Sequence, residues 1–250
     1  MGLVMTTYGI LCATPEELTA VRGRLHLPDQ PETHGPTRVW TGAHDGARIA
    51  LALSGIGKVN AAAAATLLLS TFGARTLIFS GVAGGLHPDL EVGTVLLADR
   101  LAIHDYGYVA EGRFTPTASG VIPIGAPTLT EAVAVAPQVA RDLERLAAAV
   151  GARLPHPVRR GSVVTADYFL NCAATRQELR RTLGADAIDM ESGAVAQVAE
   201  AWRAPLYVIR TLSDLAGEDS HVTYPMMVEM AAEASAVCVP ELLAILNARI

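Results

Sequence analysis

The chain has 250 residues, of which 51% are hydrophobic and 18% are charged. A chain this apolar can bury a core that offsets its ordering entropy, which excludes a disordered protein, and its length fits one large α/β domain. The net charge is −6, Lys58 is the only lysine and no basic run is present, so nucleic acid is disfavoured as a partner.

The sequence also argues against a membrane partner, secretion and a metal site. The longest apolar stretches, Ala61–Leu69 and Thr76–Ala83, are far shorter than the ~20 residues that span a bilayer, and the N-terminus lacks the basic and apolar regions of a signal peptide. Cys12, Cys172 and Cys238 are too widely separated for a disulfide framework or a zinc site. We therefore expect a cytoplasmic protein with reduced thiols and no bound metal.

The first part of the chain predicts strands that alternate with helices. Tyr8–Ala13 is a short apolar run, and helical spacing then begins at Thr14, with Pro15 at the first helical position and Glu17 three residues after the cap. The pattern continues with strands at Val39–Trp40 and Arg48–Leu53 around a turn at His44–Gly46, an alanine-rich helix at Lys58–Phe72, a buried strand at Thr76–Ser80, a glycine-rich turn at Gly81–Gly85 and a strand at Gly93–Leu101.

Residues 104–128 hold many Gly, Pro, Ser and Thr residues with little periodicity, which predicts a long irregular excursion. The remaining elements are expected to be a helix at Ala132–Val150, a strand at Val158–Ala166, a helix at Ala173–Thr182, a segment Ala187–Met190 leading into a helix at Glu191–Trp202, a strand at Pro205–Leu212 and a closing helix at Tyr224–Asn247. Neither an internal repeat nor a linker is visible, so we expect one domain over residues 1–250. Its fold class is α/β, with a mostly parallel sheet covered on both faces.

Polar motifs stand at the ends of four predicted strands. They are Thr14–Glu17, Ser54–Lys58, Asp189–Glu191 and Ser213–Asp214. In a doubly covered parallel sheet, ligands bind at the carboxyl ends of the strands. The sequence therefore predicts a binding site formed by these four motifs.

Two of the motifs offer an acid and a base. Glu17 either reaches back to the Thr14 amide as part of a capping box, or points into a cleft as a general base for water, a role that suits a carboxylate whose pKa burial raises. Asp214 either caps a following turn or acts as a general acid oriented by Ser213. The residues alone leave both alternatives open.

Other candidates would recognise a sugar and a flat base. Glu191 either belongs to an ordinary acidic helix start or accepts hydrogen bonds from two vicinal hydroxyls, because a carboxylate has two acceptor oxygens. Met190 is either core or packs on the apolar face of a sugar. Phe169 and Tyr168 follow a predicted strand and either belong to the core or stack on a base.

Two glycine-rich segments fail the cofactor patterns. Ser54–Lys58 is not followed by the Ser or Thr of a phosphate-binding loop, and Asn60 stands where a dinucleotide fingerprint requires its third glycine. Gly81–Gly85 lacks the fingerprint spacing as well. We interpret both as tight turns, or as loops whose backbone N–H groups contact a small ligand, and predict no cofactor.

Taken together, the segments resemble the purine nucleoside phosphorylase / uridine phosphorylase superfamily over nearly the whole chain. The pieces that carry the resemblance are Ser54–Val59, Ser80–Leu86, Ala166–Phe169, Asp189–Glu191 and Arg210–Asp214, together with the segment Tyr8–Glu17. The resemblance implies a three-layer α/β/α sandwich around a mixed sheet. For the nucleosidases of this superfamily it also implies homodimers in which the partner chain closes each site.

The resemblance implies that the chain hydrolyses the N-glycosidic bond of 5′-substituted adenine nucleosides, such as methylthioadenosine and S-adenosylhomocysteine, and releases adenine. Asp214 would protonate N7 of adenine, and Glu17 would position and activate the attacking water. The substrate-binding residues would be Glu191 at the ribose hydroxyls with Met190 beside the sugar, Phe169 on the base, Leu170 at the base edge through its backbone, Ser213 beside the acid, and Val82, Ala83 and Gly84 lining the ribose and base.

Three alternatives remain at this point. A phosphorylase of the same superfamily is disfavoured because residues 79–86 contain no arginine to bind a phosphate dianion. A futalosine-type nucleosidase stays open, because residues 105–114 depart from the common nucleosidase pattern and this segment is expected to help form the 5′-substituent pocket or the dimer contact. A non-catalytic nucleoside-binding protein would bind adenine nucleosides without turnover, and it would not need an acid facing a base.

Overall fold

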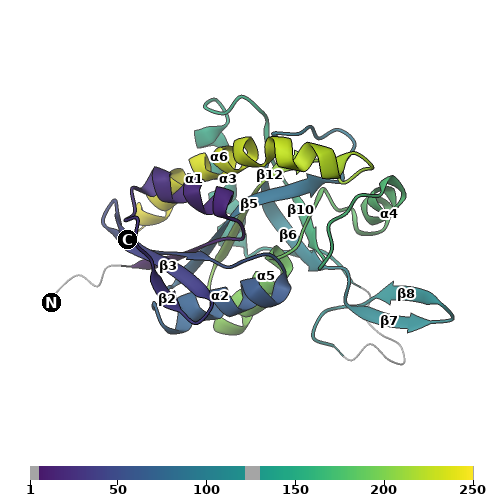
Figure 1. Cartoon of the computed structure of the whole chain (residues 1–250), viewed down its shortest axis with the longest axis horizontal. Coiled ribbons are helices and arrows are strands. Elements are labelled where there is room, and N and C mark those ends of the chain that lie inside the picture. The colour runs from purple at the N-terminus through teal and green to yellow at the C-terminus, as the bar shows by residue number, and fades with distance from the viewer. Residues whose placement is uncertain (1–5, 122–129, 250) are drawn as a thin grey trace.

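The computed structural model describes residues 6–121 and 130–249. Its centre is a ten-stranded mixed sheet with the order β11-β10-β6-β12-β5-β1-β4-β3-β2, and a short strand, β9, that also pairs with β6 (Figure 1). The strands are β1 (Thr7–Cys12), β2 (Glu32–His34), β3 (Thr37–His44), β4 (Ala47–Leu53), β5 (Thr76–Gly85), β6 (Val95–Ile103), β9 (Val133–Ala134), β10 (Val158–Thr165), β11 (Ala187–Asp189) and β12 (Leu206–Asp214).

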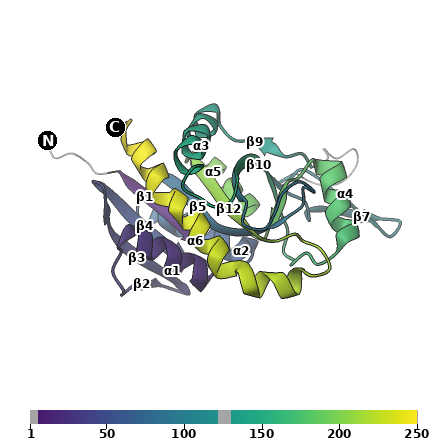
Figure 2. The same cartoon turned by 90° about the horizontal axis from the view of Figure 1, so that it is seen from above.

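Helices cover both faces of this sheet (Figure 1). One face carries α1 (Pro15–Leu25), α3 (Pro137–Val150) and α6 (Ser220–Asn247); the other carries α2 (Lys58–Ser70) and α5 (Ser192–Trp202). Strand β1 explains why both faces need a cover, because Tyr8 and Ile10 pack with the first group of helices while Leu11 packs with the second. This arrangement confirms the expected three-layer α/β/α fold. Helix α4 (Ala173–Leu183) lies at one end of the sandwich, distant from the C-terminus (Figure 2).

The segment expected to be an irregular excursion contains a hairpin. Strands β7 (Gly107–Ala110) and β8 (Arg113–Pro116) form a separate two-stranded sheet that extends away from the main body (Figure 1). Glu111 and Gly112 both adopt positive φ, as the two-residue turns favoured in hairpins require. The hairpin buries no apolar face, which is why its strands leave no alternating pattern in the sequence. The remaining part of the expected excursion, residues 122–128, lies outside the described residues.

Two other expectations are wrong. Gly81–Gly85 is not a turn, because β5 continues to Gly85 and pairs there with both β12 and β11. The helix expected from Ala132 begins at Pro137, while the residues before it include β9, which pairs with β6. Proline fits the first helical position, and its ring keeps the preceding Ala136 extended at φ −56°, ψ 144°.

Strand directions bring the predicted motifs together. Strands β1, β4, β5 and β12 are mutually parallel through the pairs β1–β4, β1–β5 and β5–β12, so their carboxyl ends share one edge. Strand β11 runs the opposite way and pairs antiparallel with β5, matching Ala187 with Gly85 and Ile188 with Gly84. The segment that follows β11 therefore lies beside the middle of β5, next to the ends of β1 and β12.

Candidate functional site

The first carboxylate of the site, Glu17, both caps a helix and contacts the central strand. Thr14 caps α1 and accepts a hydrogen bond from the Glu17 N–H at 3.4 Å, and Glu17 Oε2 accepts the N–H of Thr14 at 3.2 Å, which completes the capping box. The same Oε2 accepts the Ala13 N–H at 2.7 Å, and Oε1 reaches β5, where it accepts the Val82 N–H at 2.9 Å. The carboxylate that caps the helix therefore also faces the central strand.

Glu17 is only 2% exposed, and this burial raises the pKa of its carboxyl above the ordinary value. The nearby guanidinium of Arg210 and the N–H donors of Ala13, Val82 and Thr14 oppose the rise because they stabilise the ionised form. A raised pKa held in check by these donors is the condition expected of a carboxylate that accepts a proton near neutral pH.

Asp214, the second carboxylate, ends β12. Its Oδ1 accepts the Ala216 N–H at 2.8 Å in a local turn, and its Oδ2 accepts the Ser213 hydroxyl at 3.0 Å. Burial raises the pKa of Asp214, while the hydrogen bonds from Ser220, Ala216 and Ser213 lower it. The following helix, α6, has Asp219 as its N-cap, so Asp214 caps only the short turn before it.

Glu17 and Asp214 contact the same stretch of β5 from its two ends. A Cβ added to Gly81 would lie 2.5 Å from Glu17 Oε1, and one added to Gly84 would lie 3.2 Å from Asp214 Oδ1. Three residues of extended strand separate these glycines, which corresponds to about 10 Å. Of the segment that the resemblance assigned to the ligand lining, Val82 and Ala83 lie between these two points on β5, and Gly84 is the second of them.

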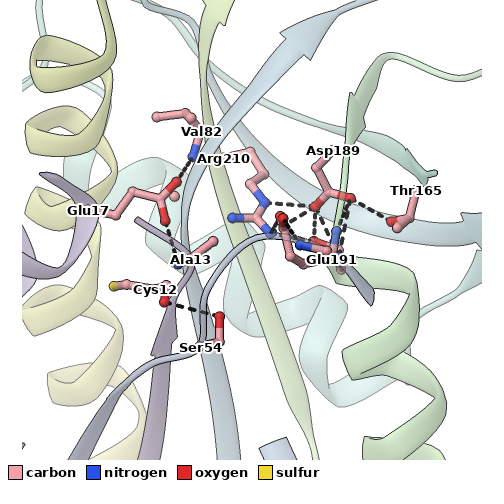
Figure 3. Close-up of polar contacts among 12 residues, drawn as sticks. Cys12, Ala13, Glu17, Ser54, Val82, Thr165, Asp189, Glu191 and Arg210 are labelled. Carbon is pink, nitrogen blue, oxygen red and sulfur yellow. Dashed lines mark hydrogen bonds and ion pairs between the residues drawn. The ribbon is translucent and has the colours of Figure 1, made fainter. Parts of the chain in front are cut away.

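Arg210 is a site residue to which the sequence analysis gave no role. It is fully buried in β12, and its guanidinium lies 4.0 Å above the ring of Phe79. Its Nε and Nη2 are 2.9 Å and 2.8 Å from Asp189 Oδ2, and Nη2 also donates to the Ser192 hydroxyl at 2.9 Å. Figure 3 places this side chain between Glu17 on one side and Asp189 and Glu191 on the other. Among the described residues, its Nη1 has no hydrogen-bond partner.

A signal for Arg210 is present in the sequence. It lies within the apolar run Leu206–Leu212, which was correctly expected to form a strand, and the structure shows that this strand is buried. Arginine is almost never fully buried unless it is paired. A charged residue in such a strand therefore indicates an internal ion pair even before its partners are known.

Asp189 and Glu191, the two carboxylates of the third motif, make different contacts. Asp189 accepts the N–H groups of Glu191 and Ser192 at 3.3 Å and 3.2 Å at the start of α5, and also the Thr165 hydroxyl at 2.5 Å. Glu191 Oε2 lies 3.7 Å from Arg210 Nη2, and Glu191 Oε1 accepts the Gly57 N–H at 3.0 Å. Burial and repulsion from Asp189 raise the pKa of Glu191, and Arg210 opposes that rise. Asp189 is thus occupied structurally, whereas Glu191 makes fewer contacts.

The aromatic candidates separate into two roles. Phe169 is 46% exposed and meets the ring of Tyr224 edge to face at 5.7 Å, whereas the Tyr168 hydroxyl is 2.9 Å from His104 Nε2. Neither ring is core. Leu170, next to Phe169, is buried. Of the two aromatic rings, Phe169 is the one free to stack on a planar ligand.

Tyr224, which the sequence analysis did not single out, lies within the electrostatic reach of several acids. Burial, together with the nearby carboxylates of Glu17, Glu16, Glu191 and Asp214, raises the pKa of Tyr224 to about 12. The Tyr224 ring therefore lies in the electrostatic field of the acidic groups of this site. Met190, by comparison, is half-buried beside Glu191.

The phosphorylase superfamily matches residues 7–247 of the chain, which is nearly its whole length. The chain belongs to the phosphorylase superfamily. Within it, the chain is 40% identical to the 5′-methylthioadenosine/S-adenosylhomocysteine nucleosidase of Mycobacterium bovis, in an alignment of 253 positions that covers 97% of this chain and 98% of the relative. It is 32% identical to the aminodeoxyfutalosine nucleosidase of Campylobacter jejuni, covering 93% and 96%.

Solved structures of the phosphorylase superfamily have the same fold. The 5′-methylthioadenosine/S-adenosylhomocysteine nucleosidase of Helicobacter pylori, in complex with a substituted pyrrolidin-3-ol, superposes with a TM-score of 0.83 at 26% identity, covering 96% of this chain and 98% of that one. The futalosine hydrolase of the same organism gives a TM-score of 0.84 at 26% identity, covering 97% and 99%. Both fold and sequence therefore relate the chain to nucleoside hydrolases of this superfamily.

Within residues 6–121 and 130–249, no group of three or more His, Cys, Asp or Glu residues is placed to hold a metal ion. No helix in the described part of the chain combines the length and apolarity needed to cross a membrane. The groups that the chain itself supplies at the site include carboxylates, the Arg210 guanidinium, the Ser213 hydroxyl and backbone N–H groups.

Proposed function

We propose that the protein hydrolyses the N-glycosidic bond of 5′-substituted adenine nucleosides, including methylthioadenosine and S-adenosylhomocysteine, and releases adenine. The observation that carries the proposal is that Glu17 and Asp214, both with pKa values raised by burial, contact the two ends of the segment Gly81–Gly84. The 40% identity to a nucleosidase over 97% of the chain supports the same activity.

Asp214 supplies the proton in this reaction. Its raised pKa increases the protonated fraction, and the Ser213 hydroxyl fixes the carboxyl group. Protonation of N7 lets adenine leave as a neutral base while the ribose becomes an oxocarbenium-like cation. A positioned general acid typically contributes about 10²–10⁴-fold to the rate.

Glu17 and Arg210 direct the water. Glu17 Oε1 and Arg210 Nη1 both lie within 2.5 Å of the position that a Cβ on Gly81 would occupy. Nη1 lacks a hydrogen-bond partner among the described residues. A water between them would donate to Glu17 and accept from Arg210, which leaves an oxygen lone pair for the anomeric carbon. An acid and a base that face each other across the sugar, roughly 6.5–9.5 Å apart, are the arrangement of an inverting glycosidase.

The other residues hold the nucleoside. Glu191 accepts the ribose 2′ and 3′ hydroxyls with its two oxygens, and Met190 lies beside the sugar. Phe169 stacks on adenine, and the backbone of Leu170 contacts the base edge. The lining segment is Val82, Ala83 and Gly84.

A phosphorylase activity is disfavoured by the charge around Arg210. The guanidinium is already paired with Asp189 and faces Glu191 and Glu17, so the site is negative overall. A phosphate dianion would be repelled there. Adenine release is therefore expected to be independent of phosphate and to yield the free 5′-substituted ribose. Formation of ribose 1-phosphate only when phosphate is present would contradict the proposal.

The 5′ substituent is tested with a substrate panel. The relative at 40% identity is a nucleosidase of methylthioadenosine and S-adenosylhomocysteine, and the relative at 32% identity is a nucleosidase of aminodeoxyfutalosine. The values of kcat/KM for adenine release from these three substrates would therefore be compared. We expect the first two to be the better substrates. Tight binding of all three without turnover would instead identify a nucleoside-binding protein.

A homodimer fits the exposed apolar residues on several elements. Val59 on α2, Val109 and Phe114 on the hairpin and Val133 on β9 are 80%, 69%, 47% and 71% exposed. A cavity of about 680 Å³, walled by β6, β9 and α5, adjoins this region. Sedimentation should give a dimer that Val59→Glu weakens and Met226→Glu, on the opposite helical layer, leaves intact; a monomeric wild type would exclude it.

A further inference from the structure

Lys58, the only lysine of the chain, joins three loops at the edge of the site. Its Nζ contacts the carboxylate of Asp105, which follows β6, and lies 3.5 Å from Oδ2 of Asp167, which follows β10. Asp105 Oδ2 also accepts the Asp167 N–H at 2.8 Å. The side chains of Lys58 and Asp105 are only 20% and 21% exposed. We call these three residues the Lys58 cluster.

The Lys58 cluster is connected to Glu191 through the start of α2. Gly57, the N-cap, provides no side chain, so the first N–H groups of the helix need other acceptors. The Gly57 N–H donates to Glu191 Oε1 at 3.0 Å, and the next N–H along the chain, that of Lys58, donates to Asp167 Oδ1 at 2.9 Å. Two consecutive N–H groups thus hold one carboxylate of the site and one carboxylate of the cluster.

The direction of the Gly57 N–H depends on an unusual backbone conformation. Gly57 has φ 97° and ψ 158°, a region that only glycine adopts readily and that persists when surrounding contacts hold it. Asp167 Oδ1 lies 3.4 Å from where a Gly57 Cβ would be. The Asp167 carboxylate is held by Lys58, and the Asp167 backbone N–H is held by Asp105. This carboxylate is therefore packed against the residue that orients Glu191.

We infer that Lys58, Asp105 and Asp167 are positioning residues: their ion pairs hold the Gly57 N–H on Glu191 and thereby fix the carboxylate that binds the ribose hydroxyls. The inference rests on the proposed nucleosidase function. The cluster does not touch the reacting atoms, and it acts on the sugar through Glu191. Because Asp167 lies two residues before Phe169, the same ion pairs also tether the loop that carries the base-stacking ring.

A positioning role for the Lys58 cluster predicts different effects on a ribonucleoside and on its 2′-deoxy analogue. Removing the Lys58 charge should impair recognition of the 2′-hydroxyl, so the preference for a ribonucleoside over its 2′-deoxy analogue should shrink. A hydrogen bond to a charged group is worth roughly ten- to a hundredfold, so we expect the preference to fall about tenfold. A purely structural role would lower activity on both substrates equally.

The experiment compares kcat/KM for 5′-methylthioadenosine and its 2′-deoxy analogue in Lys58→Met, which keeps the aliphatic stem, and in Asp105→Asn, which keeps the shape. Lys58→Arg should restore part of the preference, and Glu191→Gln should abolish it. Arg181→Met is the matched control, because it removes an arginine from an exposed ion pair with Glu178 on α4. It should keep the wild-type preference.

A wild-type preference in both Lys58→Met and Asp105→Asn would overturn the inference. If Lys58→Met fails to fold, Asp105→Asn decides alone. Should the wild type show no turnover, the proposed function fails, and the same comparison is made by calorimetry with adenosine and 2′-deoxyadenosine. A Kd ratio that shrinks about tenfold in the variants would then still support the positioning role, and an unchanged ratio would refute it.

Discussion

Glu17 Oε1 and Arg210 Nη1 both lie within 2.5 Å of the point that a side-chain carbon on residue 81 would occupy. One atom belongs to the helix after β1 and the other to the middle of β12, so the strand order β1-β5-β12 is what brings them together. Glycine at position 81 is required for this approach, although its φ is not positive. The same two atoms define the proposed position of the nucleophilic water.

Gly81→Ala should therefore inactivate the enzyme while leaving the fold. The new methyl group would displace Glu17 and Arg210 by a fraction of their contact distance, and a misplacement of about 1 Å can cost about 10²-fold in rate. Overpacking of this kind costs roughly 1–3 kcal/mol of stability. Adenine-release kinetics and thermal unfolding measure the two effects.

Gly23→Ala is the matched control for that substitution. Gly23 is exposed on α1, and an added Cβ would meet nothing within 4 Å. Alanine in place of a helical glycine should stabilise the protein by about 0.5–1 kcal/mol without changing kcat. Wild-type kcat in Gly81→Ala would show that the water position has been assigned wrongly.

Asp214→Asn should lower kcat for adenine nucleosides by about 10²–10⁴-fold, because the amide cannot donate a carboxyl proton to N7. The acid must be protonated, so wild-type activity should fall as the pH rises through its raised pKa, and the variant should lose this alkaline limb. A nitrophenyl riboside releases nitrophenolate, a leaving group that needs no protonation. Its hydrolysis should survive in Asp214→Asn, and a loss as large as that for the nucleoside would refute the acid assignment.

Glu17→Gln should impair both kinds of substrate, because every one of them needs the water. The base must be ionised, so wild-type activity should fall as the pH drops through the Glu17 pKa, which burial raises above its ordinary value. We expect a loss of about 10²–10⁴-fold and no remaining acidic limb. Full hydrolysis of the nitrophenyl riboside by the variant would contradict this role.

The raised pKa of Glu17 also predicts a pH effect on stability. A carboxyl group whose pKa is higher in the folded state stabilises the fold fully below its unfolded pKa, and that contribution is lost as the pH rises through the folded value. The neutral glutamine avoids this loss. In urea titrations, the stability of Glu17→Gln relative to wild type should therefore increase from pH 4 to pH 8, which means that its free energy of unfolding becomes larger by comparison.

Local rules predicted part of this site. The cap at Thr14, the proline after it and the carboxylate at position 17 are neighbours in sequence, and the structure has them as a capping box. The turn expected at Gly81–Gly85 failed because glycine was interpreted locally, whereas β5 is held by pairing with β11 and β12, more than 100 residues away. The contact between Arg210 and Asp189 likewise depends on strand order, which no local pattern specifies.

Arg210→Lys tests whether the guanidinium does more than balance charge. An ammonium can remain paired with Asp189, so the fold should survive, but a single nitrogen cannot bind Asp189 and also occupy the place of Nη1. We expect kcat to fall about ten- to a hundredfold, the value of a hydrogen bond to a charged group, while KM for the nucleoside changes little.

Arg210→Met provides the companion measurement, because it removes the charge altogether. Asp189 and Glu191 would then be buried without their cation, which should cost about 3–5 kcal/mol of stability. If Arg210→Lys kept wild-type kcat while Arg210→Met unfolded, the arginine would be a structural counter-ion only. The attacking water would then have to be held by Glu17 and the β5 backbone alone.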